Sequence, residues 1–358
     1  MDANSIRKII VLRFRRVGDA VLSSTICSSL RKTFPKAEID YVLNAEIAPL
    51  FENHPDIDRV ISFKKAEIKN WKIYLEKVRQ IMHSGKYDVI VDPRATFQTL
   101  WFSLFSLSSP YRIGRKKPYN RFIHNYRPDT GIDDDEIGRI LHILSPLEKD
   151  FKMQYIRDFK VYVTPEEKES FRKQMHSGGI DFSKPVMVCA VTARLTHKVW
   201  KSEYMRELLQ RIIDNYDVQL VFNYGGREEE NTAIRLQQEM GNPPCVFTNV
   251  KAGNLRELAA LLADSDFFFG NEGGPRHISQ ALDVPSFAIY PPGVGKKKWL
   301  PNASGRFQGI EPEDVSDKAR DEKLSYQEKF EFISVDEVWN QLQPMLHRFL
   351  VKDGKSIG

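Results

Sequence analysis

The segment FFFGNEGGPRHISQAL (267–282) brings several chemically active residues together. Its three phenylalanines predict a strand, and Pro275 suits the first turn of a following helix, where its missing N–H costs nothing. Gly273–Gly274 leave backbone N–H groups unshielded where the helix dipole favours an anion. Arg276 and His277 oppose that dipole, so a bound pyrophosphate would explain them. The alternative is an ordinary tight turn between a strand and a helix.

Strands and helices must alternate around this segment to position it. In the first half, apolar β-branched runs predict strands at 6–14, 37–44, 58–63 and 87–92. Apolar residues at helical spacing predict a helix at 21–34, and a second helix is predicted at 71–85, ended by Gly85. The pattern restarts in the second half, with strands at 186–191, 218–224, 245–249, 267–270 and 286–292. This alternation predicts an α/β fold of doubly wound parallel sheets.

The restart divides the chain into two Rossmann-like domains, 1–170 and 171–330, and the polar stretch 164–185 is expected to link them. Residues 331–358 follow as a C-terminal helix, interrupted near Pro344. Ligands of open α/β sheets bind outside the carboxyl ends of the strands, so we expect the site in a cleft between the domains. Neither domain has a GxGxxG motif after its first strand, which weighs against a dehydrogenase.

Composition limits the class of protein. Apolar residues make up 41% and charged residues 28% of the 358 residues, as in a soluble globular protein. The net charge of +5 suits an anionic substrate or a membrane surface, and no basic run with interleaved aromatic residues suggests nucleic acid. Three scattered cysteines, the absence of a signal peptide and the short length of LWFSLFSL (100–107) predict a cytoplasmic protein, at most peripheral to the inner membrane.

Several motifs together resemble one family. GNEGGPRHISQALDVPSFAIYPP is similar to the Asn-Asp-[Ser/Thr]-Gly-Pro-x-His signature of the heptosyltransferases, glycosyltransferase family 9. The N-terminal IIVLRFRRVGDAVL resembles that family's strand–Gly-Asp–helix start, and THKVW, NYGGREEEN and YRIGR resemble its Lys-x-Trp, Gly-Gly-x-x-Glu and Arg-Ile-Gly elements. The matches run in order along most of the chain.

The resemblance implies a GT-B fold, whose C-terminal helix (331–358) packs back on the N-terminal domain. It implies an inverting, metal-independent glycosyltransferase with no cofactor beyond its nucleotide-sugar donor. The expected donor is ADP-heptose and the expected acceptor is an anionic glycolipid, the lipopolysaccharide core.

The resemblance also implies catalytic roles for two residues. Asp19 falls at the family's catalytic base, and its place beside a predicted helix N-terminus suits an ionised carboxylate. The alternative is a plain N-cap. Lys198 falls at the family's phosphate-contacting lysine, where it would neutralise charge on the leaving diphosphate; a solvated lysine is the alternative.

Donor contacts are expected on the second domain. Thr192 follows its first strand, and Glu229 falls at the family's ribose-binding glutamate, with Glu228 and Glu230 close enough to take its place. The predicted nucleotide loop contributes Glu272, Gly273, Gly274 and His277. Glu272 replaces the family's usual Asp and Gly273 its usual Ser or Thr, which leaves the donor sugar open.

Acceptor contacts are expected from Arg13, Arg16 and Arg94, because arginines bind carboxylates and phosphates through two hydrogen bonds. A solvated basic rim is the alternative. Asp-x-Asp patterns that could hold a metal occur at 56–58, 133–135 and 264–266, but none lies in a convincing place, and we expect no metal.

Two other functions stay open. The same fold could transfer a different sugar to another surface glycan. A non-catalytic nucleotide-binding protein could retain the diphosphate loop, although the Gly18–Asp19 pair argues against it.

Overall fold

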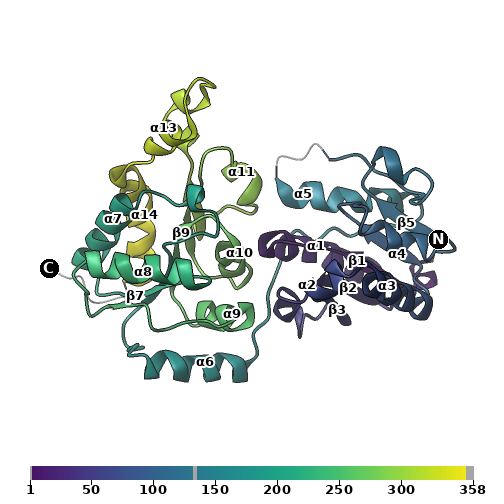
Figure 1. Cartoon of the computed structure of the whole chain (residues 1–358), viewed down its shortest axis with the longest axis horizontal. Helices are drawn as coiled ribbons and strands as arrows, with labels where there is room; N and C mark the ends of the chain where they lie inside the picture. The colour runs from purple at the N-terminus through teal and green to yellow at the C-terminus, as the bar shows by residue number, and fades with distance from the viewer. Residues whose placement is uncertain (1, 132–134, 352–358) are drawn as a thin grey trace. The chain divides into compact units, whose positions relative to one another are not determined.

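The computed structural model describes residues 2–131 and 135–351. The chain divides into two compact units, one up to Tyr162 and one from Val163 (Figure 1). Each unit is built on its own parallel sheet, as the alternating pattern predicted.

Within the described residues, the N-terminal unit contains a five-stranded parallel sheet in the order β3-β2-β1-β4-β5. Its strands are β1 (Lys8–Leu12), β2 (Glu38–Asn44), β3 (Arg59–Phe63), β4 (Val89–Asp92) and β5 (Tyr111–Gly114). Its α-helices are α1 (Val17–Thr33), α2 (Lys65–Lys69), α3 (Trp71–Gly85), α4 (Leu100–Leu104) and α5 (Glu136–Leu141). Helices α3 and α4 help to cover one face, where Tyr74, Val78 and Phe102 pack with strand residues. Helix α1 packs against α5.

The second unit contains, in the described part of the chain, a six-stranded parallel sheet in the order β11-β10-β9-β6-β7-β8. Its strands are β6 (Val186–Ala190), β7 (Gln219–Phe222), β8 (Val246–Phe247), β9 (Phe267–Asn271), β10 (Ser286–Ile289) and β11 (Phe307–Ile310). The longer helices are α6 (Pro165–Ser177), α7 (Ser202–Asn215), α8 (Arg227–Glu239), α9 (Leu255–Ala263), α10 (Gly274–Ala281) and α14 (Val335–Leu350). Short helices α11 (Lys296–Trp299), α12 (Pro312–Val315) and α13 (Tyr326–Glu331) complete it.

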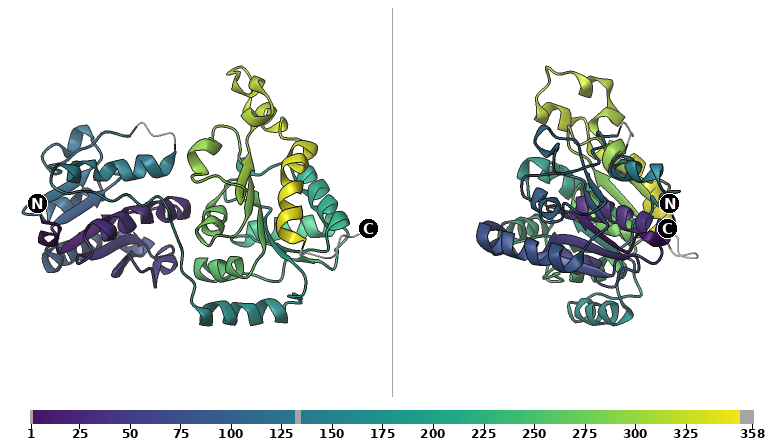
Figure 2. Two further views of the ribbon diagram at one scale, coloured as in Figure 1. Left: turned by 180° about the vertical axis from the view of Figure 1, so that it is seen from behind. Right: turned by 90° about the vertical axis from the view of Figure 1, so that its right-hand side faces the viewer.

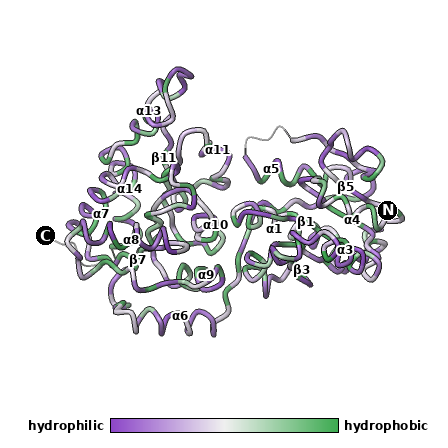
Figure 3. The backbone as a smooth tube through the Cα atoms, viewed as in Figure 1, coloured by the Kyte–Doolittle hydropathy of each residue, from purple (hydrophilic) through white to green (hydrophobic). Residues whose placement is uncertain are grey.

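The stretch predicted as a linker is instead a helix of the second unit. Thr164 and Glu167 form a capping box at the start of α6, and Phe171 and Met175 are buried along it. Most of α6 is hydrophilic (Figure 3), which is why its sequence resembles a linker. The helix packs against α9, and Arg172 pairs with Asp264 (3.0 Å). The boundary therefore lies at Tyr162, not at residue 170.

The C-terminal helix contributes to the core of the second unit. Helix α14 belongs to that unit, where Val338, Leu342 and Leu346 lie in the core, and its expected packing on the N-terminal domain stays a prediction. Figures 1 and 2 show it beside α7. Its apolar residues recur at helical spacing and fill the second unit's own sheet face, and the helix continues through Pro344.

Both sheets reverse their strand order beside the central strand. After β1 the chain adds β2 and β3 on one side, then returns to place β4 on the other; β6, β7, β8 and β9 repeat this arrangement. The loops after β1 and β4, and after β6 and β9, therefore diverge at the carboxyl edge and leave room for ligands.

We predict that Gly270→Ala destabilises the second unit. Gly270 has φ +142°, and a Cβ there would lie 2.4 Å from the backbone oxygen of Ala190 on the adjacent strand. Overpacking of this kind costs roughly 1–3 kcal/mol, and the positive φ adds strain. Gly273→Ala is the control, because its Cβ would meet only Pro275, at 3.8 Å. Urea unfolding should show a lower free energy of unfolding for Gly270→Ala alone; equal losses would contradict the packing argument.

Candidate functional site

Three loops of the second unit meet at one sheet edge because β6 lies between β9 and β7. Thr192 follows β6, Glu229 lies in the first turn of α8 after β7, and Glu272 directly follows β9. The strand order thus brings together residues that lie far apart in the sequence, as predicted for a doubly wound sheet.

Lys198 and His277 converge on Glu272. The Lys198 ammonium lies 3.5 Å from one carboxylate oxygen of Glu272, and the Nε2 atom of His277 lies 3.8 Å from the other. All three side chains are largely shielded from solvent. Helix α10 begins beside them at Gly274, so its N-terminal N–H groups add a partial positive charge. This edge can hold an anion between a lysine, a histidine and a helix N-terminus.

The charge of Glu272 depends on these neighbours. Burial by itself raises the pKa of this carboxyl, but hydrogen bonding and charge from His277, with the cations Lys198 and Arg276, lower the pKa to about 2. Glu272 is therefore ionised at neutral pH, and its carboxylate orients Lys198 at the edge.

The contacts of Trp200 explain why a tryptophan stands two residues after Lys198. Its indole is buried, with Nε1 donating to the carbonyl of Ile333 (2.9 Å), and its backbone N–H donates to the side chain of Asn271 (2.9 Å). The Asn271 amide in turn donates to the carbonyl of Ala190 (3.0 Å). Asn271 thus ties the lysine loop to two central strands. Asn271 was not identified as a site residue from the sequence, although an asparagine at a strand end was the available signal.

Among the three consecutive glutamates, Glu229 is the one that contacts Thr192. Its carboxylate accepts from the Thr192 hydroxyl (2.8 Å) and from the backbone N–H of Gly225 (3.0 Å). Glu230 instead accepts from Lys251 (3.0 Å), and Glu228 is exposed. The geometry therefore favours Glu229 among the three candidates for a group that accepts from hydroxyls.

Arg276 is bonded within the protein, whereas the sequence suggested that a bound pyrophosphate would explain it. It is fully buried, and it donates to the side chain of Gln280 and to the carbonyl of Trp299. Gln280 lies in α10 itself, and the bond to Trp299 attaches α10 to α11, which explains a cation in the first turn without a ligand. His277, by contrast, faces Glu272.

In the N-terminal unit, Asp19 forms a buried ion pair with Arg13. The Arg13 guanidinium donates to Asp19 Oδ1 at 2.5 Å, and both side chains are about nine-tenths shielded from solvent. Asp19 is the third residue of α1, and the N-cap position belongs to Arg16, which makes no side-chain cap. The interpretation of Asp19 as a plain N-cap is therefore wrong. One amino group of the Arg13 guanidinium thus donates to Asp19, and the role of Arg13 in binding an acceptor stays a prediction.

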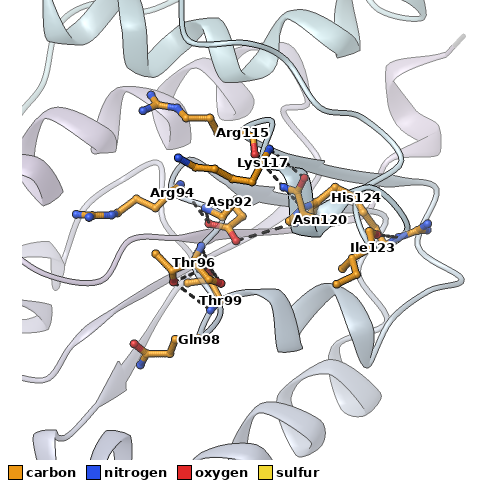
Figure 4. A network of polar contacts seen from close by, with 12 residues as sticks. Asp92, Arg94, Thr96, Gln98, Thr99, Arg115, Lys117, Asn120, Ile123 and His124 are labelled. Atoms are coloured by element: carbon orange, nitrogen blue, oxygen red, sulfur yellow. Dashed lines mark hydrogen bonds and ion pairs between the residues drawn. The ribbon is translucent and has the colours of Figure 1, made fainter.

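Exposed arginines surround this pair. Arg15 and Arg16 are exposed and have positive φ angles, 75° and 34°, at the turn between β1 and α1. Arg94 follows β4; burial and the charges of Arg13, Arg15 and Arg16 lower its pKa, while Asp19 raises it. In Figure 4, Arg94, Arg115 and Lys117 extend to the same side of the loops. The edge beside Asp19 can thus receive a strongly anionic group.

A buried carboxylate holds the loop that carries Arg94. Asp92 Oδ1 accepts from the backbone N–H groups of Arg94 (3.2 Å) and Ala95 (2.8 Å), and its Oδ2 lies 4.0 Å from His124 Nε2 (Figure 4). A Cβ at Gly114 would lie 2.4 Å from the His124 ring, so this glycine makes room for the histidine. Asp92 and His124 were not identified from the sequence.

The described aspartates of the Asp-x-Asp patterns serve the fold. Asp56 accepts from Ser28 (2.6 Å), and Asp58 pairs with Arg31. Asp264 pairs with Arg172 and Asp266 accepts from the N–H of Val186 (2.8 Å). Asp133 and Asp134 lie outside the described residues. Across residues 2–131 and 135–351, no three His, Cys, Asp or Glu side chains group as metal ligands, and no helix is long and apolar enough to cross a membrane.

We predict that Asp92→Asn removes a pH-dependent cost to stability. Burial raises the pKa of Asp92 to about 6, against partial compensation by Thr99 and backbone N–H groups. The folded protein therefore retains this proton more readily than the unfolded chain. As the pH rises from about 4 to about 6, the free energy of unfolding of the wild type should fall relative to that of the variant.

Burial, with Arg112 and Arg127, lowers the pKa of His124 to about 4, which acts in the opposite direction. His124 is present in both proteins, so subtracting the two unfolding curves leaves the contribution of Asp92 together with its coupling to His124. A difference in unfolding free energy that stays constant from pH 4 to pH 7 would contradict the prediction.

Comparison with known proteins agrees with this geometry. The model of glycosyltransferase family 9 (heptosyltransferase) matches residues 75–302. The chain is 23% identical to lipopolysaccharide heptosyltransferase 3 of Escherichia coli over 283 residues, which cover 76% of this chain and 80% of that protein.

Two solved structures have the same fold. The family 9 glycosyltransferase of Veillonella parvula superposes with a TM-score of 0.81 at 18% identity, covering 97% of this chain and 99% of that one. An Escherichia coli heptosyltransferase solved with ADP-2-deoxy-2-fluoro heptose gives a TM-score of 0.68 at 16% identity, with coverage of 94% and 99%. The chain has two Rossmann-like domains of the GT-B class and belongs to glycosyltransferase family 9, the heptosyltransferases.

Proposed function

We propose that this enzyme transfers a heptose from ADP-heptose to the core of a lipopolysaccharide, with inversion at the sugar and without a metal ion. The observation that carries the proposal is the convergence of Lys198 and His277 on Glu272 at the N-terminus of α10. Such a site suits a diphosphate. Support also comes from the relatives, since one is named for lipopolysaccharide and another was solved with an ADP-heptose analogue.

The donor is proposed to bind the second unit. Gly273 and Gly274 lack Cβ atoms, so a diphosphate can approach the N–H groups that begin α10. Lys198 would exchange part of its contact with Glu272 for the phosphates. Glu229 would accept hydrogen bonds from the ribose hydroxyls, and Thr192, its present donor, would contact a phosphate or the sugar.

The acceptor is proposed to bind the N-terminal unit. Asp19 would take the proton of the acceptor hydroxyl while that oxygen bonds to the anomeric carbon. The bond from this carbon to the diphosphate oxygen breaks, and ADP leaves with its added charge stabilised by Lys198 and the helix N-terminus. Arg13 would hold Asp19 in place, while Arg16 and Arg94 would bind anionic groups of the acceptor.

Glu272 and Gly273 favour a second candidate, the transfer of a different sugar by the same chemistry. The longer carboxylate already reaches Lys198 and His277, and Gly273 offers no hydroxyl to a donor sugar. A screen of nucleotide sugars by thermal shift would separate the two, because a ligand that binds only the folded protein raises its stability.

We predict that Lys198→Met weakens ADP binding about 10- to 100-fold, since a hydrogen bond to a charged group contributes about 1.5–3 kcal/mol. Lys201→Met is the matched control, because Lys201 pairs with Glu331 at the surface. Calorimetry in excess EDTA measures both variants. If ADP binds the wild type only when Mg²⁺ is added, metal independence is contradicted. If both variants lose ADP affinity equally, the role of Lys198 is contradicted.

We also predict that Asp19→Asn lowers turnover by about 10² to 10⁴, the usual contribution of a general base, and leaves ADP affinity unchanged. The variant leaves Arg13 buried without its charged partner, which lowers stability. Turnover must therefore be measured at a temperature where the variant is folded, as checked by its melting curve.

The double variant Arg13→Gln/Asp19→Asn separates the two effects, because it removes both charges of the pair. We expect it to regain stability and to stay inactive. Recovery of transfer activity in the double variant would show that Asp19 has only a structural role.

A further inference from the structure

Three aromatic side chains are exposed on two neighbouring loops of the N-terminal unit. Phe97, after β4, is 69% exposed; Tyr119 and Phe122, after β5, are 41% and 88% exposed. The rings of Phe97 and Tyr119 stack, with centroids 4.3 Å apart and planes 21° from parallel. Exposed aromatic residues grouped in this way mark an interaction site more often than isolated ones do.

The fold holds these rings outward. Residues 118–124 form helical turns, in which the N–H groups of Ile123 and His124 donate to the carbonyl of Asn120 (both 3.1 Å). Asn120 and His124 are buried, whereas Tyr119 and Phe122, three residues apart, share the outer side. The Tyr119 hydroxyl donates to the carbonyl of Ala95 (2.9 Å) and thereby joins the two loops. The rings are thus presented by a fixed scaffold.

The chain segment that carries the rings is basic. Residues 93–128 include no Asp or Glu and seven cations, although the excess of Lys and Arg over Asp and Glu in the whole chain is only five (53 against 48). The seven are Arg94, Arg112, Arg115, Lys116, Lys117, Arg121 and Arg127. The guanidinium of Arg121 lies over the Phe122 ring, 5.7 Å from its centroid, so a cation and an exposed ring lie together.

We propose that Phe97, Tyr119, Arg121 and Phe122 form a membrane-docking surface that binds anionic lipid headgroups. Aromatic rings with polar or charged neighbours favour the headgroup region of a bilayer, and each nearby cation is attracted to an anionic leaflet. We call these four residues the aromatic–basic surface.

A lipid surface fits better than a protein partner. Stable protein interfaces bury at least about 1,200 Å² in total around an apolar core, more than three side chains on two loop tips supply. Reversible membrane binding instead combines the burial of apolar groups in the interface with the attraction of cations to anionic lipids, and this surface offers both. The loops also follow β4 and β5, at the same sheet edge as Asp19. On the proposed function, this surface would hold the enzyme where the headgroup of a glycolipid acceptor lies.

Vesicle sedimentation tests the proposal, and it needs neither donor nor acceptor, so its outcome is independent of the sugar-transfer hypothesis. The full chain is mixed with vesicles of equimolar phosphatidylcholine and phosphatidylglycerol, or of phosphatidylcholine alone. We expect binding to the anionic vesicles that weakens with salt. Arg121→Glu/Phe122→Ala should reduce that binding about tenfold or more. Phe122→Trp should retain it, because tryptophan favours the same interface.

The matched control is Arg206→Glu/Ile234→Ala, which makes the same kind of change at exposed positions of the second unit. We expect wild-type binding from it. The proposal is overturned if the wild type does not sediment with anionic vesicles, or if both double variants lose binding equally. It is also overturned if sedimentation velocity shows that Arg121→Glu/Phe122→Ala dissociates a dimer, since the surface would then join two copies of this chain.

Discussion

Parallel pairing of the central strands is the constraint on which both candidate sites depend. In a parallel sheet all carboxyl ends lie at one edge, and a reversal of strand order separates the loops that follow the central strands. The chain meets this condition twice, between β1 and β4 and between β6 and β9. Asp19 and Arg94 follow the first pair of strands, and Thr192 and Glu272 follow the second pair. The same backbone arrangement thus creates a carboxylate site in one unit and an anion site in the other.

Buried polar side chains that have no proposed contact with a substrate hold the loops of these sites in position. Asn271 joins the lysine loop to β6, and Asp92 organises the backbone of the loop that presents Arg94. Arg276 attaches α10 to the following segment through buried hydrogen bonds. Buried polar groups of this kind are costly unless they are paired, so they fix one loop conformation. The reactive side chains can then remain at the edge, where a substrate can reach them.

Much of the fold could be predicted from the sequence, because buried parallel strands are continuous apolar runs. The runs at β1, β4, β6 and β9 were all located. The sequence of α6 predicts a linker, because its polar face dominates its composition and its partner α9 lies far along the chain. Strand β11 was missed, since FQGI is short and follows a loop.

Residues of the candidate site could be predicted only where a short sequence motif identifies them without knowledge of their partners in the fold. The Gly–Gly turn, Lys198 and Glu229 stand out in the sequence, and the structure places each at the expected sheet edge. The pairing of Asp19 with Arg13, across the turn between β1 and α1, required the structure. So did the burial of Arg276, because a sequence does not show which charged side chain lies inside.

The central claim is that the second unit binds the diphosphate while the N-terminal unit supplies the base. Hydrogen–deuterium exchange of the full chain with and without ADP tests it most directly, because it reports each loop separately. We predict slower exchange with ADP at residues 225–230 and 272–277 and unchanged exchange at 13–19 and 92–99. Slower exchange confined to the N-terminal loops would contradict the account.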